Sequence, residues 1–319
     1  MPTTSAHSGH ARTTFIDLHQ DMLSGVELLE GDFPVYGSSY LTGPSHAAAV
    51  WSSLYPRGSE SSLLGQLEAH DALLRSHSDH LRLITTVEDL DAEDPRTGVL
   101  PHSEGLQLPA DGADGLEHLW AAHALRSLSL TWNYETPYAY SCYEDSRAPL
   151  KQAGRELIAA LEATPIFLDL AHLNEAGYFE ALERYAPPAL VTHSFSRAVV
   201  DHPRGLTDEQ LRALGEHGGL VGLAFPPDFL GQRGSVDEAL RHIDRIGSVA
   251  GEDVVSIGSD WGVAEMGELG DPASLVGLVE AVGSTYGSGL AQRFAFDNAH
   301  RFLRDQLPSD GRRASRTVA

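Results

Sequence analysis

The chain has 319 residues, 42% of them hydrophobic, which is enough for one large α/β barrel or for two modest domains. Its 45 acidic and 22 basic residues give a formal net charge of -23 at pH 7. Such a charge repels phosphate groups and anionic lipids, so neither nucleic acid nor a membrane surface is expected as a partner. Residues 1–14 lack the apolar core of a secretory signal and no segment has the apolar length of a membrane span, which predicts a cytoplasmic protein.

Short apolar runs indicate the strands of a parallel sheet, because buried parallel strands appear in sequence as nearly continuous stretches of Val, Ile, Leu and Phe. In chain order the predicted strands are residues 14–18, 81–87, 98–101, 125–131, 165–170, 189–192, 219–225 and 253–258. Helical periodicity is clearest over residues 152–162, 175–185, 208–217, 236–250 and 291–303. This alternation favours a (β/α)8 TIM barrel, although a doubly wound sheet has a similar pattern.

One barrel domain is predicted over residues 14–305, with flexible tails at residues 1–13 and 306–319. Residues 22–59 interrupt the alternation with Gly, Pro, Ser and several aromatic residues. A loop of that length is usually functional or disordered, and its aromatic content argues against disorder. We therefore interpret residues 22–59 as a loop insertion that forms a lid or a subunit contact, which is compatible with a homodimer.

Histidine and carboxylate side chains lie at the ends of several predicted strands, where barrel enzymes build their active sites. They are His19, Asp21, Glu104, His172, His193 and Asp260. Imidazole nitrogens and carboxylate oxygens are the ligands that zinc prefers in the absence of thiolates, and Cys142 is the only cysteine. Any one of these histidines alone would be interpreted as a satisfied polar residue. Their joint placement predicts a metal site.

The spacing of these residues indicates two metals. In His19-x-Asp21 both side chains point to the same side of an extended strand, so one metal can bind both. A structural hydrogen-bonded pair explains this motif about equally well. His172 and His193, on neighbouring predicted strands, can bind a second metal. Glu104 has two carboxylate oxygens with which it can bridge the pair.

Longer stretches around the strand ends extend this pattern over nearly the whole chain. They are DLHQD at residues 17–21, EG at 104–105, LTWN at 130–133, LDLAH at 168–172, THSFSRAVVDHPRGL at 192–206, GGLVGLAF at 218–225, IGSDW at 257–261 and DNAHRFL at 297–303. In this order they resemble the membrane (renal) dipeptidase family, the M19 peptidases. The resemblance implies a barrel of the metal-dependent hydrolase type that binds two Zn²⁺ ions and cleaves a small dipeptide-like substrate with a free carboxylate. The zinc ligands that it implies are His19, Asp21, Glu104, His172 and His193.

The resemblance also implies roles on the substrate side. Arg204 matches the arginine that binds the substrate carboxylate, for which a surface salt bridge is the alternative. Asp260 matches the acidic residue beside a water that the two metals share. A hydroxide bridging both metals, with Glu104 between them, would attack the amide carbon, and Asp260 would pass the proton to the leaving nitrogen.

The sequence departs from the family at Trp132, where well-studied members have a histidine that helps to bind the scissile carbonyl as it becomes an oxyanion. We assign Trp132 to substrate binding, but its indole N–H carries no charge and stabilises an oxyanion less well. The segment 225–227 likewise has no tyrosine hydroxyl. Two alternatives to a dipeptidase therefore stay open. One is a specialised amide hydrolase acting on a secondary-metabolite or amino-acid conjugate, and the other is a non-catalytic barrel that binds a metal or a ligand.

Overall fold

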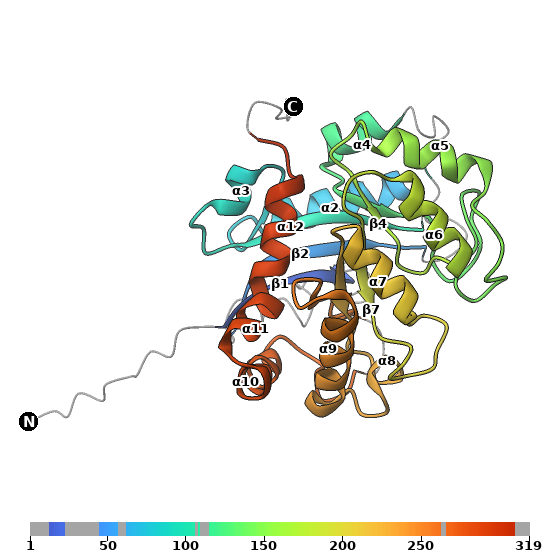
Figure 1. Ribbon diagram of the computed structural model, residues 1–319. Helices are drawn as coiled ribbons and strands as arrows, with labels where there is room; N and C mark the ends of the chain where they lie inside the picture. Colours follow the sequence, from blue (N-terminus) through green and yellow to red (C-terminus); the bar gives the residue numbers. More distant parts are fainter. Residues whose placement is uncertain are drawn as a thin grey trace, which may run out of the picture.

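The computed structural model describes residues 13–22, 45–56, 62–105, 108, 115–262 and 266–309. Within these residues, parallel strands form the centre of the molecule, and the helices lie around them (Figure 1). The strands are β1 (Thr13–Gln20), β2 (Ser45–Leu54), β3 (Leu81–Leu83), β4 (Thr97–Glu104), β5 (Ser127–Ser129), β6 (Phe167–Asp169), β7 (Leu190–Ser194), β8 (Leu220–Leu223) and β9 (Val255–Ile257).

The sheet closes into a barrel of eight strands among the described residues. Strand β1 pairs with β2 on one side and with β9 on the other, and β2 pairs with β4, so the order is β1-β2-β4-β5-β6-β7-β8-β9 and back to β1. Strand β3 pairs with β4 but takes no part in the closure. The predicted (β/α)8 barrel is confirmed, and the doubly wound sheet is excluded.

The second strand of the barrel corrects the prediction for residues 22–59. Residues 45–54, predicted as part of a loop insertion, form β2, which is buried between β1 and β4. Its sequence, SHAAAVWSSL, has only two Val, Ile or Leu residues and is rich in Ala and Ser, so it lacks the apolar run by which the other barrel strands were predicted. The predicted strand at residues 81–87 is a strand only over β3, outside the closed barrel. The remainder of the predicted insertion, residues 23–44 and 57–59, lies outside the described residues.

Helices cover the outside of the barrel, and the longer ones bury one apolar side each, as the sequence periodicity predicts. In α9, for example, Ala239, Ile243 and Ile246 are buried, and Ser235 and Glu238 form a capping box at its start. No helix in the described part of the chain is long and apolar enough to cross a membrane. The helices are α2 (Leu63–Ser76), α3 (Val87–Asp91), α4 (Leu116–His123), α5 (Gln152–Leu161), α6 (Glu175–Arg184), α7 (Asp208–Glu216), α8 (Pro227–Leu230), α9 (Val236–Ala250), α10 (Leu275–Tyr286), α11 (Ser288–Gln292), a π-helix (Arg293–Asp297) and α12 (Asn298–Gln306).

The end of the barrel domain lies slightly later in the chain than predicted. Helix α12 includes Gln306, Leu307 is buried in an apolar cluster, and the carbonyl of Pro308 accepts a hydrogen bond from the backbone N–H of Val87. These contacts hold residues 306–308 in the fold, although they belong to the predicted 306–319 tail. The polar composition of the following residues did not indicate this. At the other end Thr13 begins β1, whereas residues 1–12 and 310–319 lie outside the described residues.

Two glycines inside the barrel permit its strands to approach closely. A Cβ atom on Gly222 or Gly258 would lie 2.1 or 2.0 Å from the carbonyl oxygen of Thr192. We expect Gly258→Ala to lower the free energy of unfolding by about 2–3 kcal/mol, because the added methyl group forces backbone apart. In contrast, Gly277→Ala on the exposed side of α10 meets no atom within 4 Å and should raise it by about 0.5–1 kcal/mol. Denaturant unfolding measures both, and a Gly258→Ala variant as stable as Gly277→Ala would contradict this packing.

Candidate metal centre

All five predicted metal ligands lie at the end of the barrel where the strands terminate. His19 is the penultimate residue of β1, Glu104 is the last residue of β4, and His193 lies within β7. Asp21 directly follows β1, and His172 follows β6 by three residues. Each of these side chains is buried. The closed barrel therefore brings together residues that are up to 174 positions apart in the chain, from His19 to His193.

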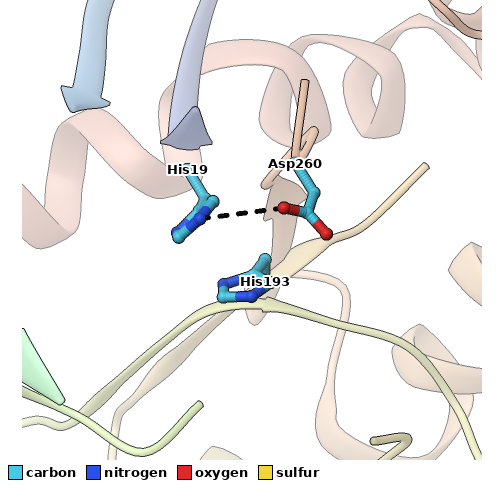
Figure 2. Close-up of side chains that lie close together, drawn as sticks. All are labelled: His19, His193 and Asp260. Atoms are coloured by element: carbon cyan, nitrogen blue, oxygen red, sulfur yellow. Dashed lines mark ion pairs between the residues drawn. The ribbon is translucent and has the colours of Figure 1, made fainter. Parts of the chain in front are cut away.

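The Nε2 atom of His19 faces three carboxylates. It lies 3.7 Å from Oδ1 of Asp21, 3.7 Å from Oε2 of Glu104 and 3.8 Å from Oδ1 of Asp260. The imidazole ring of His193 lies against that of His19, with 3.7 Å between ring centroids. Figure 2 shows His19, His193 and Asp260 pointing toward one another from separate segments of the chain. One cation at this position can contact several of these groups.

The other oxygen of Glu104 faces the two remaining histidines. Its Oε1 atom lies 2.7 Å from Nε2 of His172 and 3.4 Å from Nε2 of His193, and these two nitrogens are 3.1 Å apart. Glu104 thus presents one oxygen to each set of ligand atoms, which is what a bridging carboxylate requires. The hydroxyl of Ser53 donates a hydrogen bond of 2.9 Å to Oε2. Sequence reasoning missed Ser53 because it missed β2.

Asp260 takes part in the cluster more directly than the sequence indicated. Its carboxylate and one nitrogen from each of His19 and His193 lie within 4.8 Å of one another, so Asp260 can bind a metal as well as accept a proton. The carboxylate of Asp17 holds this region in place. It accepts hydrogen bonds from the backbone N–H and the hydroxyl of Ser259, at 2.8 and 2.6 Å, and thereby ties β1 to the segment that carries Asp260.

The charges of the cluster fit a bound cation. Burial raises the pKa of Asp260 to about 8, and the negative charges of Asp21 and Glu104 add to this rise against the opposing effect of His19. Burial alone would lower the pKa of His19, but these three carboxylates raise it to about 10. The crowded carboxylates therefore favour a bound proton. A metal ion at the same place would supply the positive charge that this proton provides. Imidazole nitrogen and carboxylate oxygen are also the donors that zinc and similar metals prefer.

The pKa values of the two histidines on the other side of Glu104 are lowered, which favours their uncharged form. Burial and the nearby positive charge of Arg204 together lower the pKa of His172 to about 4, against the opposing effect of Glu104. Burial and the charges of His19 and Arg204 hold the pKa of His193 well below its usual value. A neutral imidazole has a free lone pair on one nitrogen, which is the form that binds metals.

Backbone strain is concentrated at two residues of this cluster. His172 has φ of 65° and Asp260 has φ of 60°, in the left-handed region that residues other than glycine rarely adopt. Such conformations cost on the order of 1–3 kcal/mol and persist where the surrounding structure holds them. Here the carbonyl of His172 accepts a hydrogen bond from the N–H of Cys142 at 2.7 Å, and the N–H of Asp260 donates to the carbonyl of His19 at 3.0 Å.

A cavity of about 390 Å³ lies over the cluster and includes both predicted substrate-binding residues in its wall. Arg204 is only 4% exposed, and its Nη2 donates to the backbone carbonyl of His193 at 3.2 Å. This burial excludes the alternative that Arg204 forms a surface salt bridge. Trp132 is half-buried, with its ring 6.5 Å from that of His172 and 5.4 Å from that of Tyr55, measured between centroids.

Sequence reasoning assigned no role in the site to several other residues that line this cavity. They are Tyr55, Asn133, Tyr143 and Phe229. The aromatic content of residues 22–59 was a signal for Tyr55, and the neighbouring Trp132 was a signal for Asn133. Tyr143 lies in the connection after β5 and Phe229 in the short helix α8 after β8, and neither segment carries a recognisable motif, so only the folded chain brings them to the cavity.

A closed parallel barrel with a buried cluster of histidines and carboxylates at its carboxyl end defines a barrel of the metal-dependent hydrolase class. A family model described as membrane dipeptidase (peptidase family M19) matches residues 11–314, and the chain belongs to this family. It is therefore a metal-dependent hydrolase of dipeptidase type, and the alternative of a non-catalytic barrel is not supported.

The chain is also similar in sequence or structure to individual proteins. An uncharacterized protein in the pqqA 5' region of Klebsiella pneumoniae is 32% identical over 76% of this chain and 93% of its own length. The match covers 58% and 52% of the length of two other curated relatives. The solved dipeptidase AC, a metallopeptidase of family M19, is 26% identical with a TM-score of 0.81, covering 93% of this chain and 99% of that chain. A Rhodobacter sphaeroides metallopeptidase, liganded with a phosphinate mimic of L-Ala-D-Ala, shares the fold at 24% identity and a TM-score of 0.79, with 93% and 99% covered.

Proposed function

We propose that this protein is a zinc-dependent dipeptidase that hydrolyses the amide bond of a dipeptide or dipeptide-like substrate with a free carboxylate. The observation that supports this most is the position of Glu104, whose two oxygens face separate sets of histidine nitrogens. A buried arginine, Arg204, lies on the wall of the same cavity. This combination supplies both a two-metal donor set and a cation for the substrate carboxylate.

The residues have separate tasks in this proposal. The five predicted ligands would hold two zinc ions, and Glu104 would contribute to both sets of ligands. When bound, such a pair of ions provides hydroxide at neutral pH and polarises the amide carbonyl. Asp260, which lies within 3.8 Å of His19, accepts the proton of the attacking water and returns it to the leaving nitrogen. The planar guanidinium of Arg204 forms two parallel hydrogen bonds with the substrate carboxylate.

A second candidate function has a specific observation in its favour. Trp132 contributes to the wall of the cavity together with Tyr55, Tyr143 and Phe229, so four aromatic side chains are among the residues that line a site of about 390 Å³. Such a wall favours a flat or apolar group next to the cleaved bond. The substrate in this case is an amino-acid conjugate or another amide of aromatic character, and the metal chemistry is unchanged.

Metal removal and a substrate panel test the proposed function. The protein is treated with a chelator, supplied with zinc, and assayed on dipeptides and on amino acids that carry an aromatic acyl group. The proposal predicts that activity is lost without metal and returns with two equivalents of zinc on dipeptides with a free carboxylate. Turnover of the acyl amino acids alone would favour the second candidate, and a zinc-loaded protein inert on both classes would contradict both.

Trp132→His should separate the two candidates further. Histidine can carry a positive charge and stabilise an oxyanion, so we expect kcat for simple dipeptides to rise about tenfold to a hundredfold. Removal of the indole should at the same time raise KM for aromatic acyl amino acids. Steady-state kinetics on both substrate classes provides the measurement. A fall in dipeptide turnover would show that the indole itself contributes to catalysis on dipeptides.

A further inference from the structure

A chain of hydrogen bonds leads away from the metal centre on the far side of His193. Its Nε2 atom faces Glu104 and His172, and its Nδ1 atom lies 3.0 Å from the hydroxyl oxygen of Thr192. The same hydroxyl lies 2.8 Å from Oδ2 of Asp169, at the end of the neighbouring strand β6. All of these side chains are buried, so water cannot replace the contacts.

The donors and acceptors in this chain can be assigned from its far end. Oδ1 of Asp169 accepts hydrogen bonds from the backbone N–H groups of Thr192 and Ala171, at 2.9 and 3.0 Å, and Nε2 of His102 lies 3.3 Å from Oδ2. An ionised carboxylate accepts hydrogen bonds and donates none. The hydroxyl proton of Thr192 is therefore directed to Asp169, and the hydroxyl oxygen is left to accept a proton from Nδ1 of His193.

This assignment determines the tautomer of His193. A neutral imidazole carries one proton, and if that proton is on Nδ1 the lone pair is on Nε2, which faces the metal site. The other two histidines differ in this respect. Nδ1 of His19 and Nδ1 of His172 are buried and have no hydrogen-bond partner among the described residues. Within the described chain, only His193 of the three has its second ring nitrogen fixed by a side chain.

We propose that Thr192, oriented by Asp169, is a positioning residue that fixes His193 with its proton on Nδ1, so that Nε2 is always available to the metal on that side of Glu104. This inference rests on the proposed two-metal centre. Groups that orient a metal-binding histidine in this way typically contribute tenfold to a hundredfold to metal affinity.

Three threonine variants test the proposal without relying on hydrolysis. Thr192→Val keeps the shape and removes the hydroxyl, Thr192→Ser keeps the hydroxyl, and Thr131→Val is the matched control. Thr131 is buried two residues after β5, and its hydroxyl has no hydrogen-bond partner among the described residues. Zinc affinity, measured by competition with a chromogenic chelator, should fall tenfold to a hundredfold for one of two zinc ions in Thr192→Val. The zinc affinities of Thr192→Ser and Thr131→Val should remain close to that of the unsubstituted protein.

Asp169→Asn should reverse the hydrogen bonds instead of removing them. The asparagine carbonyl can still accept from the two backbone N–H groups, but its NH₂ group then donates to the hydroxyl of Thr192. That hydroxyl would donate to Nδ1 of His193, which places the ring proton on Nε2 and blocks the metal. We expect the loss of zinc affinity in Asp169→Asn to exceed the loss in Thr192→Val.

The tautomer can also be observed directly in the metal-free, unsubstituted protein, which avoids any effect of a variant on folding. ¹⁵N NMR of the imidazole should show the proton of His193 on Nδ1, and a proton on Nε2 would overturn the proposal. Equal loss of zinc affinity in Thr192→Val and Thr131→Val, or no loss in either, would also overturn it. A protein that binds no zinc even without substitution would contradict the proposed function instead, so the two failures are distinguishable.

Discussion

Glu104→Gln is expected to lower kcat/KM for dipeptide hydrolysis on the order of a thousandfold. Glutamine has nearly the same shape as glutamate, but it has only one oxygen and no charge, so it cannot bridge two cations. Metal ions contribute several kcal/mol to the stabilisation of charge in the transition state, and about 4 kcal/mol corresponds to a thousandfold change in rate. The same variant should lose at least one of two zinc ions on gel filtration, which elemental analysis measures.

Ser53→Ala provides the control for this variant. The hydroxyl of Ser53 donates to Oε2 of Glu104, so its removal loosens the carboxylate but leaves both oxygens in place. We expect Ser53→Ala to keep two zinc ions and to lose about tenfold in activity, at the low end of the effects of such supporting contacts. A Glu104→Gln protein that keeps two zinc ions and a similar activity would remove Glu104 from its proposed bridging role.

Arg204→Ala is expected to raise KM for dipeptides with a free carboxylate by about a hundredfold. A charged partner lost from a buried hydrogen-bonded pair costs about 2–5 kcal/mol, and each 1.4 kcal/mol corresponds to tenfold in binding. Dipeptides with an amidated C-terminus have no such charge, so their KM should change much less. Steady-state kinetics on paired acids and amides measures the difference.

The lysine variant refines this test. Arg204→Lys keeps the positive charge but loses the planar fork that forms two parallel hydrogen bonds, so an intermediate KM is expected. Because Arg204 also donates to the carbonyl of His193, zinc content has to be compared in both variants. Equal effects on acids and amides at full zinc content would refute the assignment of Arg204 to the substrate carboxylate.

Much of the fold and of the candidate site follows from local patterns. Apolar runs marked seven of the eight barrel strands, because strands buried on both sides need large apolar residues. The parallel arrangement then places all strand ends at one rim, so His19, Glu104 and His193 could be predicted to lie together without knowledge of any distance.

The remainder depended on packing that no local pattern encodes. Strand β2 was not predicted because many of its residues are alanine and serine. For the same reason Ser53, which donates a hydrogen bond to Glu104, was not predicted to lie near the site. Phe229 reaches the cavity from the short helix α8, which carries no recognisable motif. Whether Asp260 accepts protons or also binds metal depends on distances of a few ångströms, which spacing along the chain does not determine.

Anomalous X-ray diffraction from crystals of the zinc-loaded protein, recorded at the zinc absorption edge, tests the two-metal centre most directly. The account predicts two peaks within bonding distance of Glu104, one beside His19 and Asp21 and the other beside His172 and His193. A single peak, or zinc bound away from Glu104, would contradict it.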